Sequence, residues 1–251
     1  MVKVLQILIC SEFGLFKRND SNELGLTYNF PPKTQILGLL GSVIGLSGYS
    51  EGKSKPEFYE KLKWFKIAIQ PLGENKENLM EAPKKTIITY NNYHGYGSME
   101  EGGILQVREQ ILIRPTFRIF VKGEGEEYIK LKSRLENQEY FYTPYFGKNE
   151  FLAEIHYEGE KEISKITDGE VSIQSIFLKE YAKYNIAPTR ENPTRAKLII
   201  ADDYPVSFDE NYIYQKKVAI YADGVQKPDY DKMEKDGFEI CEVNQQPLFF
   251  I

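Results

Sequence analysis

The stretch from Leu26 to Gly48, LTYNFPPKTQILGLLGSVIGLSG, constrains the fold more than any other part of the chain. Its two consecutive prolines end an extended segment, and a proline at the start of a helix removes no hydrogen bond, so the pattern predicts a helix beginning at about Pro32. At about 100° per residue, the large aliphatic side chains fall on one side of this helix, and Gly38, Gly41 and Gly45 fall on the other. One face is therefore suited to the core, and the opposite face is nearly bare backbone.

The glycine face requires a close neighbour, because each glycine inside a helix costs roughly 0.5–1 kcal/mol relative to alanine. One interpretation is that another helix or a sheet packs tightly on the glycines. The other interpretation is a phosphate backbone, since Lys33, Thr34 and Gln35 stand at the helix start, where unpaired amides and the helix dipole favour an anion. The sequence leaves both interpretations open.

Length and composition place the chain among ordinary globular proteins. Its 251 residues, 41% of them hydrophobic, can form one large core or two modest ones. No apolar run reaches the roughly 18 residues that cross a bilayer, and the N-terminal residues lack a signal-peptide pattern, so we expect a cytoplasmic protein with no membrane partner. The two cysteines, Cys10 and Cys241, and the two histidines show no spacing typical of zinc or iron sites, so we expect a reduced protein without metal or cofactor.

The net charge of −5 argues at first against nucleic acid, because phosphate binding is dominated by lysine and arginine. The charge is unevenly distributed, however. Residues 1–156 carry 20 basic and 19 acidic side chains, whereas residues 157–251 carry 12 basic and 18 acidic ones. Within residues 83–122, six basic residues outnumber three acidic ones, so a local basic surface is retained.

Hydrophobic patterning predicts an alternation of strands and helices over the first 157 residues. The predicted elements cover residues 2–10, 32–45, 56–62, 64–70, 84–93, 104–121, 126–135 and 144–157, and the strand at 64–70 is expected to stop at Pro71. Apart from the short helix at 56–62 and the hairpin, their order is strand, helix, strand, strand, helix, strand. That order is typical of an α+β, ferredoxin-like fold, which the RNA-recognition motif shares.

A long hairpin insertion is predicted at about residues 84–121, with a glycine-rich tip over His94–Gly103. Its flanks combine basic and aromatic side chains, a mixture that holds a single nucleic-acid strand by charge and stacking, although an ordinary β-hairpin loop gives the same local pattern. We expect the ferredoxin-like domain to end at residue 157. Residues 158–251 are then a β-rich C-terminal extension, with short strands at 172–178, 197–201, 217–221 and 238–243.

Two stretches of the sequence carry a family resemblance. Asn22–Leu46, reading NELGLTYNFPPKTQILGLLGSVIGL, and Pro144–Ala153, reading PYFGKNEFLA, resemble the signature of the CRISPR-associated Cas-five family of the RAMP superfamily. The first strand, the proline pair entering a glycine-rich helix, the basic hairpin and the second stretch follow one another in the family's order. The resemblance covers residues 1–157 and is closest to the type I-B members.

This resemblance implies a non-catalytic RNA-binding subunit of a type I Cascade complex, which serves defence against foreign DNA. Such a subunit grips the 5′ handle of the CRISPR RNA and caps one end of the backbone filament. The hairpin would reach as a thumb towards the neighbouring backbone subunit. The large subunit would be a further partner, and target DNA would be met through the assembled complex.

Two other functions compete with RNA binding. A metal-independent endoribonuclease that processes precursor CRISPR RNA needs a base and an acid near the scissile phosphate, and the only histidines are His94 in the predicted tip and His156 in a predicted strand. The lysine–histidine pairing associated with the cutting subtype is absent. A ferredoxin-like protein-interaction module is the third possibility, and binding to a handle oligonucleotide would distinguish it.

We predict RNA contacts at the start of the glycine-rich helix, in the loop before it, in the turn after Gly147 and on the hairpin. Tyr90 and Tyr93 would stack on a displaced base, whereas Arg118 is expected to be structural because it lies within an alternating strand. The predicted RNA-binding residues are Lys17, Arg18, Lys33, Thr34, Gln35, Gly38, Lys84, Lys85, Tyr90, Tyr93, Arg108, Arg114, Lys148 and Asn149. No catalytic residue is assigned.

Overall fold

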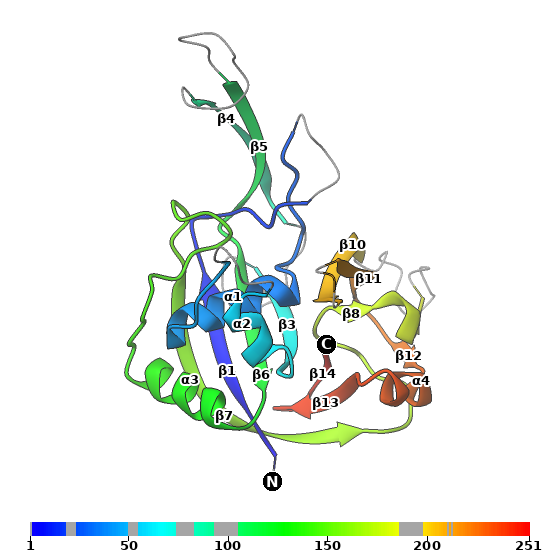
Figure 1. The fold of residues 1–251 in the computed structure, drawn as a ribbon. Coiled ribbons are helices and arrows are strands. Elements are labelled where there is room, and N and C mark those ends of the chain that lie inside the picture. Colours follow the sequence, from blue (N-terminus) through cyan, green and yellow to red (C-terminus); the bar gives the residue numbers. More distant parts are fainter. Residues whose placement is uncertain are drawn as a thin grey trace.

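The computed structural model describes residues 2–18, 24–49, 55–73, 83–92, 105–185, 198–209, 211 and 213–251. The predicted hairpin tip, residues 94–103, and the predicted stacking residue Tyr93 lie outside the described residues. Figure 1 shows a body in which helices cover a curved sheet, and a hairpin that projects from it.

The central sheet has six strands in the order β14-β13-β7-β1-β6-β3, and all of the pairings between them are antiparallel. Its strands are β1 (Lys3–Cys10), β3 (Lys66–Leu72), β6 (Thr116–Lys122), β7 (Glu154–Ile166), β13 (Glu239–Val243) and β14 (Gln246–Phe250). The two ends of the sheet meet, because Ile67 and Ile251 exchange two backbone hydrogen bonds of 3.0 Å. The sheet therefore curls round on itself.

Three helices lie on one face of this sheet: α1 (Lys33–Ile44), α2 (Glu57–Leu62) and α3 (Glu126–Glu136). The helix that organises the sequence begins directly after Pro32, as predicted. It ends one residue before Gly45, which has a left-handed φ of 80° and forms the C-cap. Gly45 is thus a helix terminator rather than the third member of an intrahelical glycine stripe, which corrects the predicted pattern.

Alternation along the strands divides the apolar side chains between two clusters. Leu5, Ile7 and Ile9 of β1 belong to the large core that packs against the helices. The opposite face holds a smaller cluster inside the curl of the sheet: Val4, Ala68, Phe120, Cys241, Val243, Leu248 and Phe250. Burial there raises the pKa of the Cys241 thiol to about 11, so this cysteine is an inert core residue.

The projecting hairpin consists of β4 (Lys85–Asn92) and β5 (Leu105–Ile113), and the short β2 (Phe13–Gly14) pairs with its base in the order β2-β5-β4. Arg114, with a φ of 48°, and Pro115 then turn the chain into β6. The hairpin therefore ends at Ile113, earlier than the predicted 121, because the residues after Pro115 form a central strand. Pro71 does not stop its strand either, because β3 includes it and continues to Leu72. The strand β3 is the last in the sheet order and pairs with β6, and a proline, which lacks an N–H, is tolerated in such an end strand.

The C-terminal third packs beside the helices through several short elements. They are β8 (Phe177–Leu178), η1 (Lys179–Tyr181), β9 (Ala182–Tyr184), β10 (Leu198–Phe208), β11 (Tyr214–Ala222), β12 (Gln226–Pro228) and α4 (Tyr230–Lys235). The boundary expected at residue 157 falls inside β7, a continuous strand of 13 residues, and β13 and β14 extend the same sheet. Of the strand predicted at 172–178, only its last two residues form β8.

Gly45→Ala should lower the free energy of unfolding by about 1–3 kcal/mol, because alanine is strained in the left-handed region. Its methyl group would also lie 2.7 Å from the ring of Phe141. Urea denaturation checks this, with Gly48→Ala as the control, since a Cβ at Gly48 meets no atom within 4 Å. Equal stability of the two variants would contradict the assignment of Gly45 as the cap.

Candidate nucleic-acid interface

A cleft of about 770 Å³ opens along the outward face of α1. Thr34, Gln35, Gly38 and Ser42 of α1 form its floor. Its walls come from α2, from the segment before β7 and from the C-terminal third. They include Phe58, Tyr142, Tyr145, Phe146, Gly147, Phe208 and Tyr214. The glycine face thus borders a hollow whose walls come from three separate parts of the chain.

The two intrahelical glycines have different surroundings within this hollow. A Cβ at Gly41 would lie 2.5 Å from the Cβ of Phe58, so α2 occupies the space above it. A Cβ at Gly38 would lie 3.6 Å from the Phe58 ring, which is ordinary van der Waals contact. Close protein packing therefore explains Gly41. Gly38 lines the cleft, so a ligand on this end of the helix face stays a prediction.

Polar groups at the start of α1 differ in how they face the cleft. Thr34 is buried, and the buried Gln35 Oε1 receives no hydrogen bond from any described residue. Lys33 is half-buried and does not line the cleft. Burial, followed by the nearby charge of Lys66, lowers the pKa of Lys33 to about 8. The helix start thus gives the cleft the positive end of its dipole, whereas the Gln35 oxygen is buried and the Lys33 ammonium lies elsewhere.

The turn after Pro144 is held against the body by glycine. Gly147 has a φ of 83°, and a Cβ there would overlap the carbonyl oxygen of Leu15, so only glycine fits. The next residue, Lys148, donates to the largely buried carboxylate of Glu109 at 2.7 Å and to the Tyr90 hydroxyl at 3.2 Å. Lys148 thereby links this turn to both strands of the hairpin. Removing it would leave Glu109 without this partner, at a cost of about 1–3 kcal/mol.

Further cations gather at the base of the hairpin. Lys85 Nζ donates to the carbonyl oxygen of Thr27 at 3.1 Å, and burial, together with the charge of Arg18, lowers the pKa of Lys85 to about 8. The Arg18 guanidinium lies 5.4 Å from the centre of the Tyr28 ring. Residues 24–28 also add an edge to the hairpin, since Gly25 exchanges backbone hydrogen bonds with both neighbours of Glu109.

The predicted RNA-binding residues thus fall into groups. Thr34, Gln35 and Gly38 line the cleft, whereas Arg18, Lys85, Tyr90 and Lys148 cluster at the hairpin base. Exposed positions are occupied by Lys17, Lys84, Arg108, Arg114 and Asn149, with Arg114 Nε 3.6 Å from Glu12. Arg118 is structural as predicted, because its Nε donates to Glu158 at 2.7 Å.

Sequence reasoning missed the aromatic wall of the cleft. Tyr142 and Tyr145 line it while remaining 51% and 47% exposed. The signal was present in EYFYTPYF, residues 139–146, where five aromatic residues crowd into a stretch with no helical or strand periodicity. Tyrosine combines a large ring with a polar hydroxyl and is enriched at interfaces, so a cluster of tyrosines outside any periodic element indicates a binding surface.

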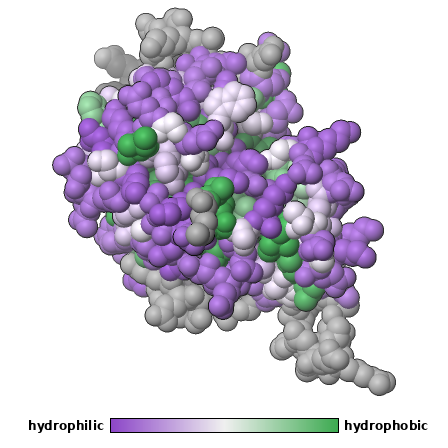
Figure 2. Space-filling model, turned by 90° about the horizontal axis from the view of Figure 1, so that it is seen from below, coloured by the Kyte–Doolittle hydropathy of each residue, from purple (hydrophilic) through white to green (hydrophobic). Residues whose placement is uncertain are grey.

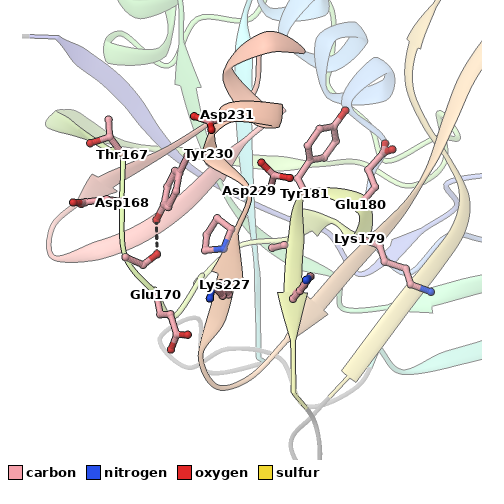
Figure 3. A pocket seen from close by; sticks show the side chains of 14 residues that line it. Thr167, Asp168, Glu170, Lys179, Glu180, Tyr181, Lys227, Asp229, Tyr230 and Asp231 are labelled. Carbon is pink, nitrogen blue, oxygen red and sulfur yellow. Dashed lines mark hydrogen bonds between the residues drawn. The ribbon is translucent and has the colours of Figure 1, made fainter.

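A second cleft of about 710 Å³ lies in the C-terminal third between η1, β12 and α4. In Figure 3 the Tyr230 hydroxyl reaches across to the chain at residue 169, where it donates to the carbonyl oxygen of Gly169 at 3.1 Å. Five carboxylates and three lysines line it: Asp168, Glu170, Glu180, Asp229, Asp231, Lys179, Lys183 and Lys227. An excess of acidic groups disfavours a phosphate backbone, so this cleft is the weaker candidate.

The molecular surface seen from below is mostly hydrophilic, with only small and separate hydrophobic areas (Figure 2). That view offers no broad apolar patch for protein docking. Among the described residues, no helix has the length and hydrophobicity needed to cross a bilayer.

The architecture is a mixed α/β fold made mostly of strands, and solved structures share it. A chain from a "CRISPR RNA-guided surveillance complex" matches with a TM-score of 0.50 and 10% identity over 90% of this chain and 91% of that one. A chain from a "Type III-B Cmr-beta bound to cognate target RNA and AMPPnP" matches with a TM-score of 0.51 and 10% identity over 92% and 88%. At these identities the likeness concerns the fold alone.

The sequence itself defines the family. Residues 4–215 match the family described as CRISPR-associated protein (Cas_Cas5), and this chain belongs to it. No curated protein matches the chain significantly.

Lys33→Met should raise the free energy of unfolding at pH 7. Lysine in the unfolded chain has a pKa near about 10.4, so the folded state, with its pKa of about 8, binds fewer protons between pH 8 and 10. The penalty for burying the charge is complete below pH 8 and fades as the pH rises towards 10, so the advantage of methionine should shrink over that window. Urea denaturation at pH 7 and pH 10 measures it.

Lys130→Met is the matched control, because Lys130 is exposed on α3. Its effect should differ little between the two pH values. A Lys33→Met protein that is less stable at pH 7 would refute the buried position of this ammonium.

Proposed function

We propose that this chain is a non-catalytic RNA-binding subunit of a type I CRISPR Cascade complex, which holds the 5′ handle of the CRISPR RNA and caps the backbone filament. The observation that carries the proposal is the cleft at the Gly38 end of α1, where bare backbone, the start of the helix and exposed tyrosines border one hollow. Membership of the family and structural neighbours from RNA-guided complexes support it.

The cleft suits a single RNA strand better than a compact ligand. Tyr142 and Tyr145 project from one wall and present rings on which bases stack, at about 1–3 kcal/mol per base. The positive end of the α1 dipole favours a phosphate, and the Gln35 side chain, which lines the cleft, carries an amide of the kind that bonds a base edge or a 2′-hydroxyl. Gly38 lets the strand approach the helix backbone closely.

The strand order supports a ferredoxin-like description of the first part of the chain. Strands β7, β1, β6 and β3 are neighbours in that order, and α1 and α3 connect β1 to β3 and β6 to β7. This arrangement matches the RNA-recognition motif, although in this chain the helix face rather than the sheet face carries the cleft.

The hairpin is proposed to act as the thumb that reaches the neighbouring backbone subunit. It projects from the body (Figure 1). Its described part exposes the cationic side chains of Lys84 and Arg108 together with the apolar side chains of Ile87 and Leu105. Such a mixture suits a surface that meets protein and RNA together. The large subunit and, through the complex, target DNA are the further proposed partners, in a cytoplasmic, type I-B-like defence system.

The assignment as non-catalytic rests on the position of His156. Its neighbours Ile155 and Tyr157 face the helix-side core, so His156 points to the opposite side of the sheet from the α1 cleft. Purified protein should therefore leave labelled precursor repeat RNA intact, with magnesium and with chelator. A specific cut within the repeat that disappears in His156→Ala or His94→Ala would overturn this assignment.

Gly38→Ala tests the cleft directly. The new methyl group makes only ordinary contact with Phe58, so the variant should be as stable as the parent or gain up to about 1 kcal/mol from helix propensity. The same methyl group should hold the RNA away, and a loss of about 1.4 kcal/mol would weaken handle binding tenfold. Thermal melting and titration with a handle oligonucleotide at fixed salt measure both effects.

Gly41→Ala is the stability control, since its methyl group enters space already filled by Phe58 and should lower stability by about 1–3 kcal/mol. A Gly38→Ala protein that binds the handle with unchanged affinity would remove the α1 cleft from the RNA site.

A further inference from the structure

Three metal-binding side chains meet where β1 ends and β7 begins. Cys10 is opposite Glu154 in the register of the two strands, and Leu8 is opposite His156, so Cys10 and His156 are diagonal neighbours. The Cys10 Sγ lies 3.8 Å from Glu154 Oε2, and His156 Nε2 lies 3.6 Å from the same oxygen. One ligand atom of each residue lies within 4.8 Å of the other two.

The two separations to Glu154 Oε2 fit a tetrahedral metal centre. With Zn–S near about 2.3 Å and Zn–O and Zn–N near about 2.1 Å, tetrahedral angles place sulfur and oxygen about 3.6 Å apart, and nitrogen and oxygen about 3.4 Å apart. The observed distances exceed these values by only 0.2 Å each. The third pair, Cys10 Sγ and His156 Nε2, lies within 4.8 Å and must approach to about 3.6 Å, which requires a rotation of the exposed His156 side chain.

The surroundings favour a borderline-soft divalent ion. Thiolate, imidazole and carboxylate together are a donor set that zinc accepts, whereas magnesium and calcium prefer oxygen alone. Cys10 is buried, while Glu154 and His156 are 73% and 52% exposed, so an ion can enter from solvent and keep one open position. Two hydrogen-bonded strands hold all three residues, which limits the entropy lost on binding.

We propose that Cys10, Glu154 and His156 bind a zinc-like divalent ion, with water as the fourth ligand. The site lies on the sheet face opposite the helices, away from the α1 cleft, and does not depend on the proposed RNA role. Bound metal would join the end of β1 to the start of β7. In the chain, β1 leads into β2 at the hairpin base, and β7 follows the residues that form a wall of the cleft. A metal at this site would correct the expectation of a metal-free protein. No local spacing in the sequence indicates such a site, because Cys10 and Glu154 are 144 residues apart.

The test uses the full chain after treatment with a chelator. Calorimetric titration with zinc chloride should give one saturable site per chain, and zinc should raise the melting temperature. Cobalt should give the intense near-ultraviolet absorption of a thiolate–metal bond. His156→Ala and Glu154→Gln change exposed side chains and should each weaken zinc binding at least about 100-fold, more than a residue outside the ligand set would.

Cys10→Ser should abolish the cobalt–thiolate absorption, and Cys241→Ser, which changes the cysteine in the other cluster, should retain it. Glu150→Gln, an exposed carboxylate nearby in sequence, should bind zinc like the parent. The proposal is overturned if chelator-treated protein shows no saturable zinc binding, or if His156→Ala and Glu154→Gln bind zinc as tightly as the parent does.

Discussion

Burial of one face of α1 against the central sheet determines the rest of this structure. Ile36, Leu37, Leu40 and Val43 are at most 1% exposed, and fully burying each such side chain contributes about 1.5–3 kcal/mol. This fixes the rotation of the helix, so Gly38 and Gly41 must face away from the sheet. Phe58 then fills the space above Gly41, whereas its ring leaves room for a methyl group at Gly38, so core packing determines the shape of the candidate site.

Long-range contacts complete what the helix begins. The curled sheet brings Ile251 beside Ile67, and the buried Tyr204 donates to the carbonyl oxygen of Pro31 at 2.8 Å, directly before α1. The C-terminal third thereby supplies Phe208 and Tyr214 to the cleft. The Lys148–Glu109 pair links the turn after the aromatic wall to the hairpin. Hydrogen bonds between distant parts of the chain thus hold the cleft walls and the hairpin in place relative to each other.

Local physics made the helix α1, its start at Pro32, the projecting hairpin and the structural role of Arg118 predictable from sequence. The periodicity of the helix extended it through Gly45, although a glycine after the last apolar turn is itself a local signal for a left-handed C-cap. The continuation of β7 past residue 157 depends on its pairing with β13, which is distant in the chain. Lys33 resembled a phosphate ligand because the sequence gives its position in the chain but not the direction of its side chain. The pairing of distant strands likewise concealed the walls of the cleft and the meeting of Cys10 with His156.

The most direct test of RNA binding on the glycine face is ultraviolet cross-linking of the protein to its bound RNA, followed by mass spectrometry of the cross-linked peptides. If the α1 cleft holds the strand, cross-links should map to Tyr142 or Tyr145, which line it with their rings exposed. Cross-links confined to the acidic C-terminal cleft, at Tyr181 or Tyr230, would contradict RNA binding on the glycine face.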